Sequence, residues 1–168
     1  MKEFIKKHKD TLTYILVLIA IFGGIAVSRI FITPVIVSGH SMDTTLSDGM
    51  YGFSSNVKDG TEIERGDIVI VQTDEKVLVK RIIGMPGETI RCENNTVYIN
   101  GEALEEDYTL GTTDNFNEYV LGEDEYFVMG DNRENSKDSR AIGAITKDQI
   151  IAKHLFVISS ISKFGYHK

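Results

Sequence analysis

Two side chains of this sequence, Ser41 and Lys80, are candidates for nucleophilic catalysis. Ser41 lies in the segment Ser38-Gly39-His40-Ser41-Met42, just beyond a short apolar run. Gly39 has no Cβ, so another backbone can approach closely at this point. A serine hydroxyl becomes a nucleophile only when a neighbouring base takes its proton. By itself the segment is also typical of a simple turn, so a catalytic role for Ser41 requires a base close to its hydroxyl.

Histidine is the usual base, but none of the four histidines is well placed to serve Ser41. His8 precedes a long uncharged segment, and His167 lies in the C-terminal tail. His40 is the chain neighbour of Ser41, so on an extended chain their side chains point to opposite faces. His154 alternates with apolar residues and is expected to be a packed core residue. A Ser-His-Asp triad is therefore poorly supported.

Lys80 is a better candidate for the base. In a strand over residues 77–83, alternation places Leu78, Lys80 and Ile82 on one face. Apolar neighbours remove water from the ammonium group and lower its pKa from the ordinary value of ~10.4, which makes a base near neutral pH. Arg81 points to the other face and stays protonated. The alternative is a lysine whose stem packs while its ammonium reaches solvent.

A third segment, residues 130–140, is rich in Asp, Asn, Arg and Ser side chains. Such a composition suits a loop that supports a site through ion pairs and hydrogen bonds. Asp138 and Arg140 are able to pair, and a serine hydroxyl is able to orient a neutral lysine amine. The alternative is a solvated polar loop that follows a strand.

The elements that must position these groups are mainly short strands. Apolar runs separated by turn residues predict strands at 35–37, 67–71, 76–83, 88–91, 96–100, 125–129 and 150–158. Asn94-Asn95 is a tight-turn signal and predicts a hairpin. The segment 102–124 is acidic with few apolar residues, and we expect it to be a surface excursion between core strands. The pattern predicts a mainly β fold, built from sheets with short connections.

The charges of the 168-residue chain are divided unevenly along it. Residues 1–10 carry a net +2, the next 18 residues are uncharged, and the part after Arg29 has 13 basic and 23 acidic residues. Eighteen helical residues span about 27 Å, close to the ~30 Å hydrocarbon core of a bilayer. Residues 30–32 can extend this span while Arg29 reaches toward the headgroups. We therefore expect a membrane anchor at 11–32.

Lysines before the anchor favour a cytoplasmic N-terminus at 1–10 and an extracytoplasmic domain at 33–168. A cleavable signal peptide is the alternative, because Ala26-Val27-Ser28 has the pattern of a cleavage site.

The net charge of −7 argues against nucleic acid as the main partner. The single cysteine, Cys92, cannot form an internal disulfide or by itself a cysteine-based zinc site.

Four segments, in this order and behind an anchor, together resemble the bacterial type I signal peptidases. These are membrane-bound Ser/Lys proteases that remove signal peptides from exported proteins. The matching segments are 38–42, 65–69, 79–88 and 130–140. The likeness covers the anchor and residues 35–143 and is weakest across 102–124. It implies an antiparallel β-sheet catalytic domain of the signal peptidase and LexA-like type, with one N-terminal transmembrane helix.

The resemblance also implies roles for particular residues. Ser41 would be the nucleophile, with its backbone N–H as one oxyanion donor, and Lys80 the general base. Ser136 resembles the serine that orients the lysine amine. Asp138 and Arg140 resemble the ion pair that braces the site. No metal or cofactor is implied.

The expected substrates are preprotein signal peptides with small side chains before the cut, bound extended as an added strand between the segments around Gly39 and Leu78. The residues expected to bind substrate are Val37, Gly39, Met42, Leu46, Leu78 and Val79. The other expected partner is the lipid bilayer, with the chain acting as a monomer or in transient proximity to the secretion translocon. A retained anchor fits this reading better than a cleaved signal, because Ser41 lies only 12 residues after Arg29.

Two positions depart from the family pattern. Thr44 stands where the nucleophile segment usually has proline, which removes a fixed φ and is expected to tune the loop without loss of activity. Gly39 stands where some relatives use a serine hydroxyl as second oxyanion donor, so the second donor is undetermined. The rival functions are a LexA-like Ser/Lys autoprotease, and an inactive or precursor-binding homologue of the same fold.

Overall fold

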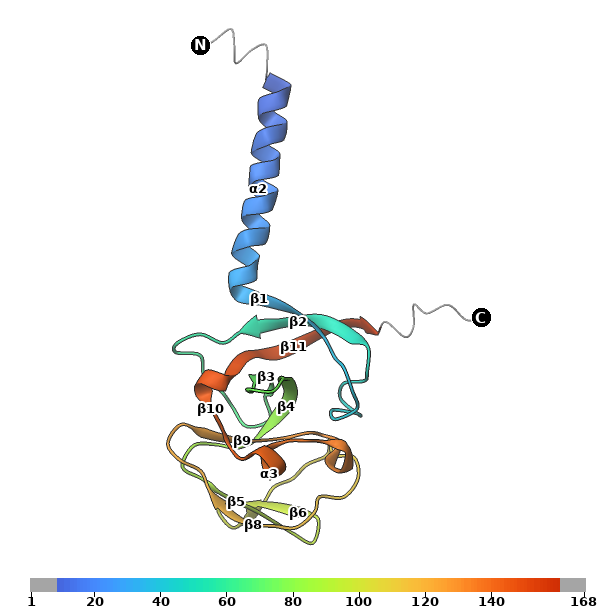
Figure 1. The fold of residues 1–168 in the computed structure, drawn as a ribbon, viewed down its shortest axis with the longest axis vertical. Coiled ribbons are helices and arrows are strands. Elements are labelled where there is room, and N and C mark those ends of the chain that lie inside the picture. Colours follow the sequence, from blue (N-terminus) through green and yellow to red (C-terminus); the bar gives the residue numbers. More distant parts are fainter. Residues whose placement is uncertain (1–8, 161–168) are drawn as a thin grey trace, which may run out of the picture.

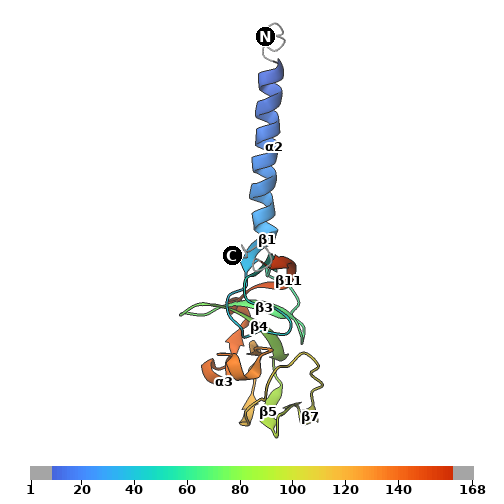
Figure 2. The ribbon, with the colours of Figure 1, turned by 90° about the vertical axis from the view of Figure 1, so that its right-hand side faces the viewer.

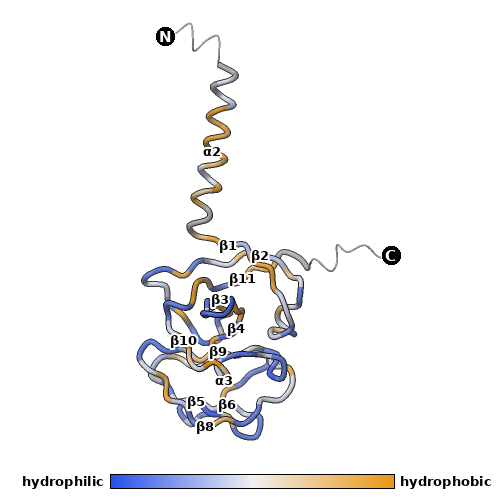
Figure 3. The backbone as a smooth tube through the Cα atoms, viewed as in Figure 1, coloured by the Kyte–Doolittle hydropathy of each residue, from blue (hydrophilic) through white to orange (hydrophobic). Residues whose placement is uncertain are grey.

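The computed structural model describes residues 9–160 of the chain. The helix α2 (Lys9–Phe31) extends away from a β-rich region that contains the remaining elements, as Figures 1 and 2 show. Its apolar side chains, among them Leu16 and Phe22, are exposed, and the hydropathy along the helix is visible in Figure 3. Of the helices within the described residues, none has both the length and the apolar character that a membrane crossing requires.

Eleven strands form two antiparallel sheets, which confirms the predicted mainly β fold within the described residues. The first sheet has seven strands in the order β1 (Ile32–Ile36), β2 (Met50–Asn56), β11 (Ile150–Ser160), β3 (Ile68–Gln72), β4 (Val77–Gly84), β9 (Glu125–Met129) and β10 (Ile145–Thr146). The second has four strands in the order β7 (Glu102–Ala103), β6 (Thr96–Ile99), β5 (Thr89–Glu93) and β8 (Phe116–Val120). Three short helical turns complete the fold: η1 (Arg133–Asn135), α3 (Ser139–Ile142) and η2 (Lys147–Gln149).

The interior strand β4 shows why the site lies where it does. Leu78, Lys80 and Ile82 share its buried face, as the alternation predicts, and Arg81 lies on the other. β4 pairs with β3 on one side and with β9 on the other, so it is an interior strand. An interior strand is held by hydrogen bonds along both edges, so it provides a rigid support for a functional side chain.

Strand β2 was not predicted, because its sequence Met-Tyr-Gly-Phe-Ser-Ser-Asn lacks a clear apolar alternation. Tertiary pairing nevertheless places it between β1 and β11. A Cβ at Gly52 would collide with the backbone of Phe156, so glycine permits β11 to approach closely here.

The prediction of a packed His154 was wrong. β11 changes register between Lys153 and Phe156, and His154 has a φ of +55° within this irregularity. The side chain is half exposed, with Nε2 3.3 Å from Asp67 Oδ1. A β-bulge redirects side chains relative to the simple alternation on which the prediction rested. His8 and His167 lie outside the described residues.

The acidic segment 102–124 is more than the predicted surface excursion, because it supplies strands β7 and β8 to the second sheet. β8 pairs with β5, and Leu121 at its end is buried in the core between the sheets. Thr113 is also buried, whereas most of the acidic side chains are exposed. The few apolar residues of this segment form no periodic pattern, yet they pack in the core and hold the segment against the second sheet. The predicted cytoplasmic end at 1–10 falls largely outside the described residues.

Candidate active site

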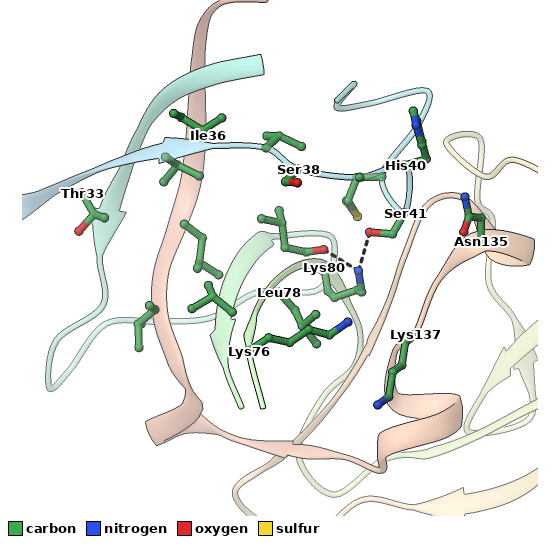
Figure 4. A pocket seen from close by; sticks show the side chains of 18 of the residues that line it. Thr33, Ile36, Ser38, His40, Ser41, Lys76, Leu78, Lys80, Asn135 and Lys137 are labelled. Atoms are coloured by element: carbon green, nitrogen blue, oxygen red, sulfur yellow. Dashed lines mark hydrogen bonds between the residues drawn. The ribbon is translucent and has the colours of Figure 1, made fainter. Parts of the chain in front are cut away.

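Ser41 and Lys80 meet at one end of a cleft between β1 and β4, as Figure 4 shows. Lys80 Nζ lies 2.6 Å from Ser41 Oγ and also donates a hydrogen bond of 2.9 Å to the Val79 carbonyl. Ser41 comes from the loop that follows β1, and Lys80 from the middle of β4. Tertiary structure thus brings the two sequence-predicted groups into direct contact.

Burial prepares Lys80 to act as a base. The residue is only 2% exposed, and this desolvation is the main cause that lowers the pKa of its ammonium to about 8. The Asp138 carboxylate opposes the shift and nearby Lys76 reinforces it. A lysine with such a pKa has a substantial neutral fraction in mildly alkaline solution, which a solvated lysine does not.

The loop after β1 presents Ser41 because apolar residues on both sides of it are buried. Met42 and Leu46 pack with Val37, and the Leu46 N–H donates to the Met42 carbonyl at 2.7 Å. Gly39 has a φ of +96°, and its N–H donates to Asp48 Oδ1 at 2.8 Å. These contacts form the tight turn from which Ser41 points toward Lys80.

The loop 130–140 lies beside this pair and is held by the predicted ion pair. Arg140 Nε donates to Asp138 Oδ1 at 2.8 Å, and Asp138 Oδ2 accepts the Gly130 N–H at 2.9 Å. Asp138 is fully buried. Burial raises the pKa of this carboxyl, but the hydrogen bonds from Arg140 and Gly130 outweigh it and the pKa is lowered overall. Asp138 is therefore a carboxylate at neutral pH.

The resemblance also implied that the Ser136 hydroxyl orients the lysine amine. The hydrogen bonds of Lys80 Nζ go to Ser41 and Val79, and Ser136 Oγ is buried without a hydrogen-bond partner among the described residues. Ser136 lies near Asp138, and this proximity helps to lower the pKa of that carboxyl. Ser136 thus lies next to the bracing carboxylate, and an orienting contact with the lysine amine is not formed in this structure.

The cleft has a volume of about 740 Å³ and accounts for most of the predicted substrate-binding residues. Five of the six line it: Val37, Gly39, Met42, Leu78 and Val79. Leu46 does not, because it is 3% exposed and packs beneath Met42. No cluster of three or more His, Cys, Asp or Glu side chains suited to a metal ion occurs in residues 9–160.

Several residues that hold the site together were missed by sequence reasoning. Arg81 forms a bidentate ion pair with buried Asp131, whose Oδ2 also accepts a hydrogen bond from Thr45. The Asn132 N–H donates to the Ser41 carbonyl at 3.0 Å. The composition of the 130–140 loop predicted a support of this kind, but pairings between distant segments have no local signal.

Comparisons with known proteins agree with this fold. The family model described as signal peptidase, peptidase S26, matches residues 8–159. A signal peptidase I of Bacillus amyloliquefaciens is 37% identical, over 84% of this chain and 83% of its own. Signal peptidase I S of Bacillus subtilis is 36% identical over 92% of each chain. Signal peptidase IB of Staphylococcus aureus is 34% identical, over 84% of this chain and 85% of its own.

A solved structure supports the same assignment. The crystal structure of a signal peptidase I from Enterococcus faecalis superimposes with a TM-score of 0.51 and 30% sequence identity, covering 56% of this chain and 97% of that one. The fold and the family match together define a hydrolase of the serine protease class. The chain belongs to the signal peptidase family, peptidase S26.

Proposed function

We propose that this chain cleaves N-terminal signal peptides from exported preproteins, with Ser41 as nucleophile and Lys80 as general base. The observation that carries the proposal is the 2.6 Å contact between Ser41 Oγ and the ammonium nitrogen of a buried lysine. Nucleophile and base within hydrogen-bond distance is the arrangement that covalent serine catalysis requires. The names of the relatives support the choice of substrate.

The reaction follows from this contact. Neutral Lys80 takes the Ser41 proton while Oγ bonds to the scissile carbonyl carbon, which gives a tetrahedral intermediate. The Ser41 N–H stabilises the oxyanion as one donor. Lys80 then gives the proton to the departing amine as the C–N bond breaks, leaving an acyl-enzyme. Water, deprotonated by Lys80, attacks the ester and releases the signal peptide with a free carboxylate.

The cleft supports an extended substrate with small side chains before the cut. It runs along the end of β1 and the first half of β4, so a peptide can bind between them as an added strand. Buried Met42 and Val37 fill the space beneath the Ser41 end of the cleft. We propose that these side chains limit the depth at this end, so that alanine-sized residues are favoured by steric exclusion.

We further propose that the N-terminal segment anchors the enzyme in the cell membrane, with residues 1–10 cytoplasmic and 33–168 outside. The sequence from Thr11 to Ser28 carries no charged residue. A 23-residue helix is about 35 Å long, enough for the hydrocarbon core. Ser41 lies ten residues beyond the end of α2, close to where an anchored helix would leave the bilayer.

The partners proposed are therefore the signal peptides of preproteins and the lipid bilayer. Because a precursor emerging from the membrane reaches the cleft directly, the enzyme is proposed to act as a monomer or transiently near the secretion translocon.

The direct test compares Ser41→Ala, Lys80→Ala and Lys80→Arg with the wild type on a detergent-solubilised precursor that has a small-x-small site. All three should lose cleavage, and Lys80→Arg is informative because it retains the positive charge but not the base. Ser47→Ala and Lys147→Ala, which lie outside the cleft, are the matched controls and should cleave normally. Cleavage at the wild-type rate by any of the three site variants would reject the Ser41–Lys80 assignment.

A further inference from the structure

Residues 104–113, here called the bracing segment, contact both loops that form the active site. On the nucleophile side, Thr44 Oγ1 donates to the Tyr108 carbonyl at 2.9 Å. On the other side, the Leu110 N–H donates to the Asp131 carbonyl and the Arg133 N–H donates to the Leu110 carbonyl, each at 2.8 Å. The bracing segment is thus hydrogen-bonded to the Ser41 loop and to the 130–140 loop at once.

An ion pair reinforces the second of these contacts. Arg133 Nη1 and Nη2 donate to the two carboxylate oxygens of Glu106, at 3.1 and 2.5 Å. The Arg133 side chain is 1% exposed and that of Glu106 only 9%. Arg133 Nε in turn donates to the Gly130 carbonyl at 3.1 Å. Glu106 therefore neutralises the buried charge of Arg133, which would otherwise be unpaired next to Gly130.

Tyr108 links this ion pair to a second one, formed by Arg81 and Asp131. Its hydroxyl donates to Glu106 Oε1 at 2.8 Å, and its ring lies 4.0 Å from the Arg81 guanidinium. Arg81 is paired with Asp131 and also donates to Thr45 Oγ1 at 3.2 Å. Burial and the Glu106 carboxylate raise the pKa of Tyr108, so its hydroxyl remains a donor across the working pH range.

We propose that Glu106 and Tyr108 are positioning residues that hold the Ser41 loop and the 130–140 loop in register for catalysis. Glu106 acts through Arg133 on Gly130, whose N–H binds Asp138, and Tyr108 acts through its hydroxyl on Glu106 and through its ring on Arg81. Neither side chain lines the substrate cleft, so neither contacts substrate. The inference rests on the proposed peptidase function and gives the acidic excursion a specific role in it.

The test uses the full chain in detergent and a fluorogenic peptide with a small-x-small site. Glu106→Gln keeps the shape but removes the charge that pairs with Arg133. We expect kcat to fall about tenfold with KM nearly unchanged, because small displacements of catalytic groups cost rate while the cleft remains intact. Tyr108→Phe keeps the ring on Arg81 and removes only the hydroxyl, and should lower kcat about threefold. Glu105→Gln is the matched control, an exposed neighbour with no ion pair among the described residues.

Thermal unfolding of each variant shows whether the protein is folded at the assay temperature. If Glu106→Gln does not fold, Tyr108→Phe decides the question. A folded Glu106→Gln with wild-type kcat, a loss confined to KM, or an equal loss in Glu105→Gln would overturn the inference. A wild-type protein that leaves the peptide uncleaved would instead count against the proposed function, which separates the two failures.

Discussion

Lys80 Nζ and Ser41 Oγ are 2.6 Å apart, although the two residues are separated by 39 positions in the sequence. The contact joins an interior strand to a loop whose Met42 and Leu46 belong to a buried cluster against which Val79 of that strand packs. Because Lys80 is desolvated, the contact combines proximity with an altered pKa.

The pH dependence of kcat/KM reports the ionisation of Lys80 in the free enzyme. Its pKa is lowered to about 8, and the ammonium form cannot accept the Ser41 proton. Activity should therefore be low at acidic pH and rise through an apparent pKa near 8. A rise centred near the ordinary lysine value of ~10.4 would contradict the desolvation of Lys80.

Replacing Lys76 with glutamine should move the rise of kcat/KM to higher pH. The Lys76 charge lowers the pKa of Lys80, so removing a like charge makes protonation of Lys80 easier. The displacement is small, because Lys76 is exposed and its field is screened by salt. The pH profiles of kcat/KM measured at low and at high salt should therefore differ less in the variant than in the wild type. Lys58 lies outside the cleft, so Lys58→Gln should leave the apparent pKa of this rise unchanged.

Thr44 has a φ of +77°, a value that proline cannot adopt. Restoring the family proline with Thr44→Pro should therefore destabilise the protein, by about 2 kcal/mol or more. Thr44→Gly relieves the strain of a β-branched residue at this φ but loses the hydrogen bond to Tyr108, so it should be nearly neutral. Denaturant unfolding measures both. Equal stability of Thr44→Pro and wild type would show that the loop adopts another conformation.

Gly130 is expected to tolerate no side chain. A Cβ at this position would collide with Ser136 Oγ and with the Ser41 carbonyl, and the latter is backbone that carries the nucleophile. Gly130→Ala should reduce kcat about a hundredfold, since a displacement of about 1 Å is sufficient for such a loss. Gly122→Ala is the control, because a Cβ there meets only the flexible Glu125 side chain at ordinary contact distance. Similar activities for the two variants would refute the steric argument.

Lys80→Met should stabilise the folded state while abolishing cleavage. The unfolded chain binds the Lys80 proton up to pH ~10.4, whereas the folded chain releases it at about 8. Below pH 8 the buried charge thus costs stability in full, and the cost disappears as pH rises toward 10.4. Allowing for the lost hydrogen bonds, we expect a gain of about 1–2 kcal/mol at pH 7 that shrinks at pH 10. Denaturant unfolding at both pH values tests this, and an unchanged or lower stability at pH 7 would contradict it.

The sequence by itself was sufficient for those features that depend on local pattern. Alternation along 77–83 placed Lys80 on the buried face of a strand, and the short spacing of Asp138 and Arg140 allowed their ion pair. Both follow from the geometry of a few consecutive residues. The likeness of several short segments to one family then indicated the serine protease class, which the comparisons establish.

Tertiary structure alone decided the features that depend on contacts between distant segments. The bulge that turned His154 out of the core, the insertion of β2 beside β11, and the pairing of Glu106 with Arg133 have no counterpart in local periodicity. Their energies come from burial and from charges brought together by folding, so they exist only once strand register has been chosen. For the same reason, the sequence could nominate Ser41 and Lys80, but only the packing of β4 against the nucleophile loop placed them 2.6 Å apart.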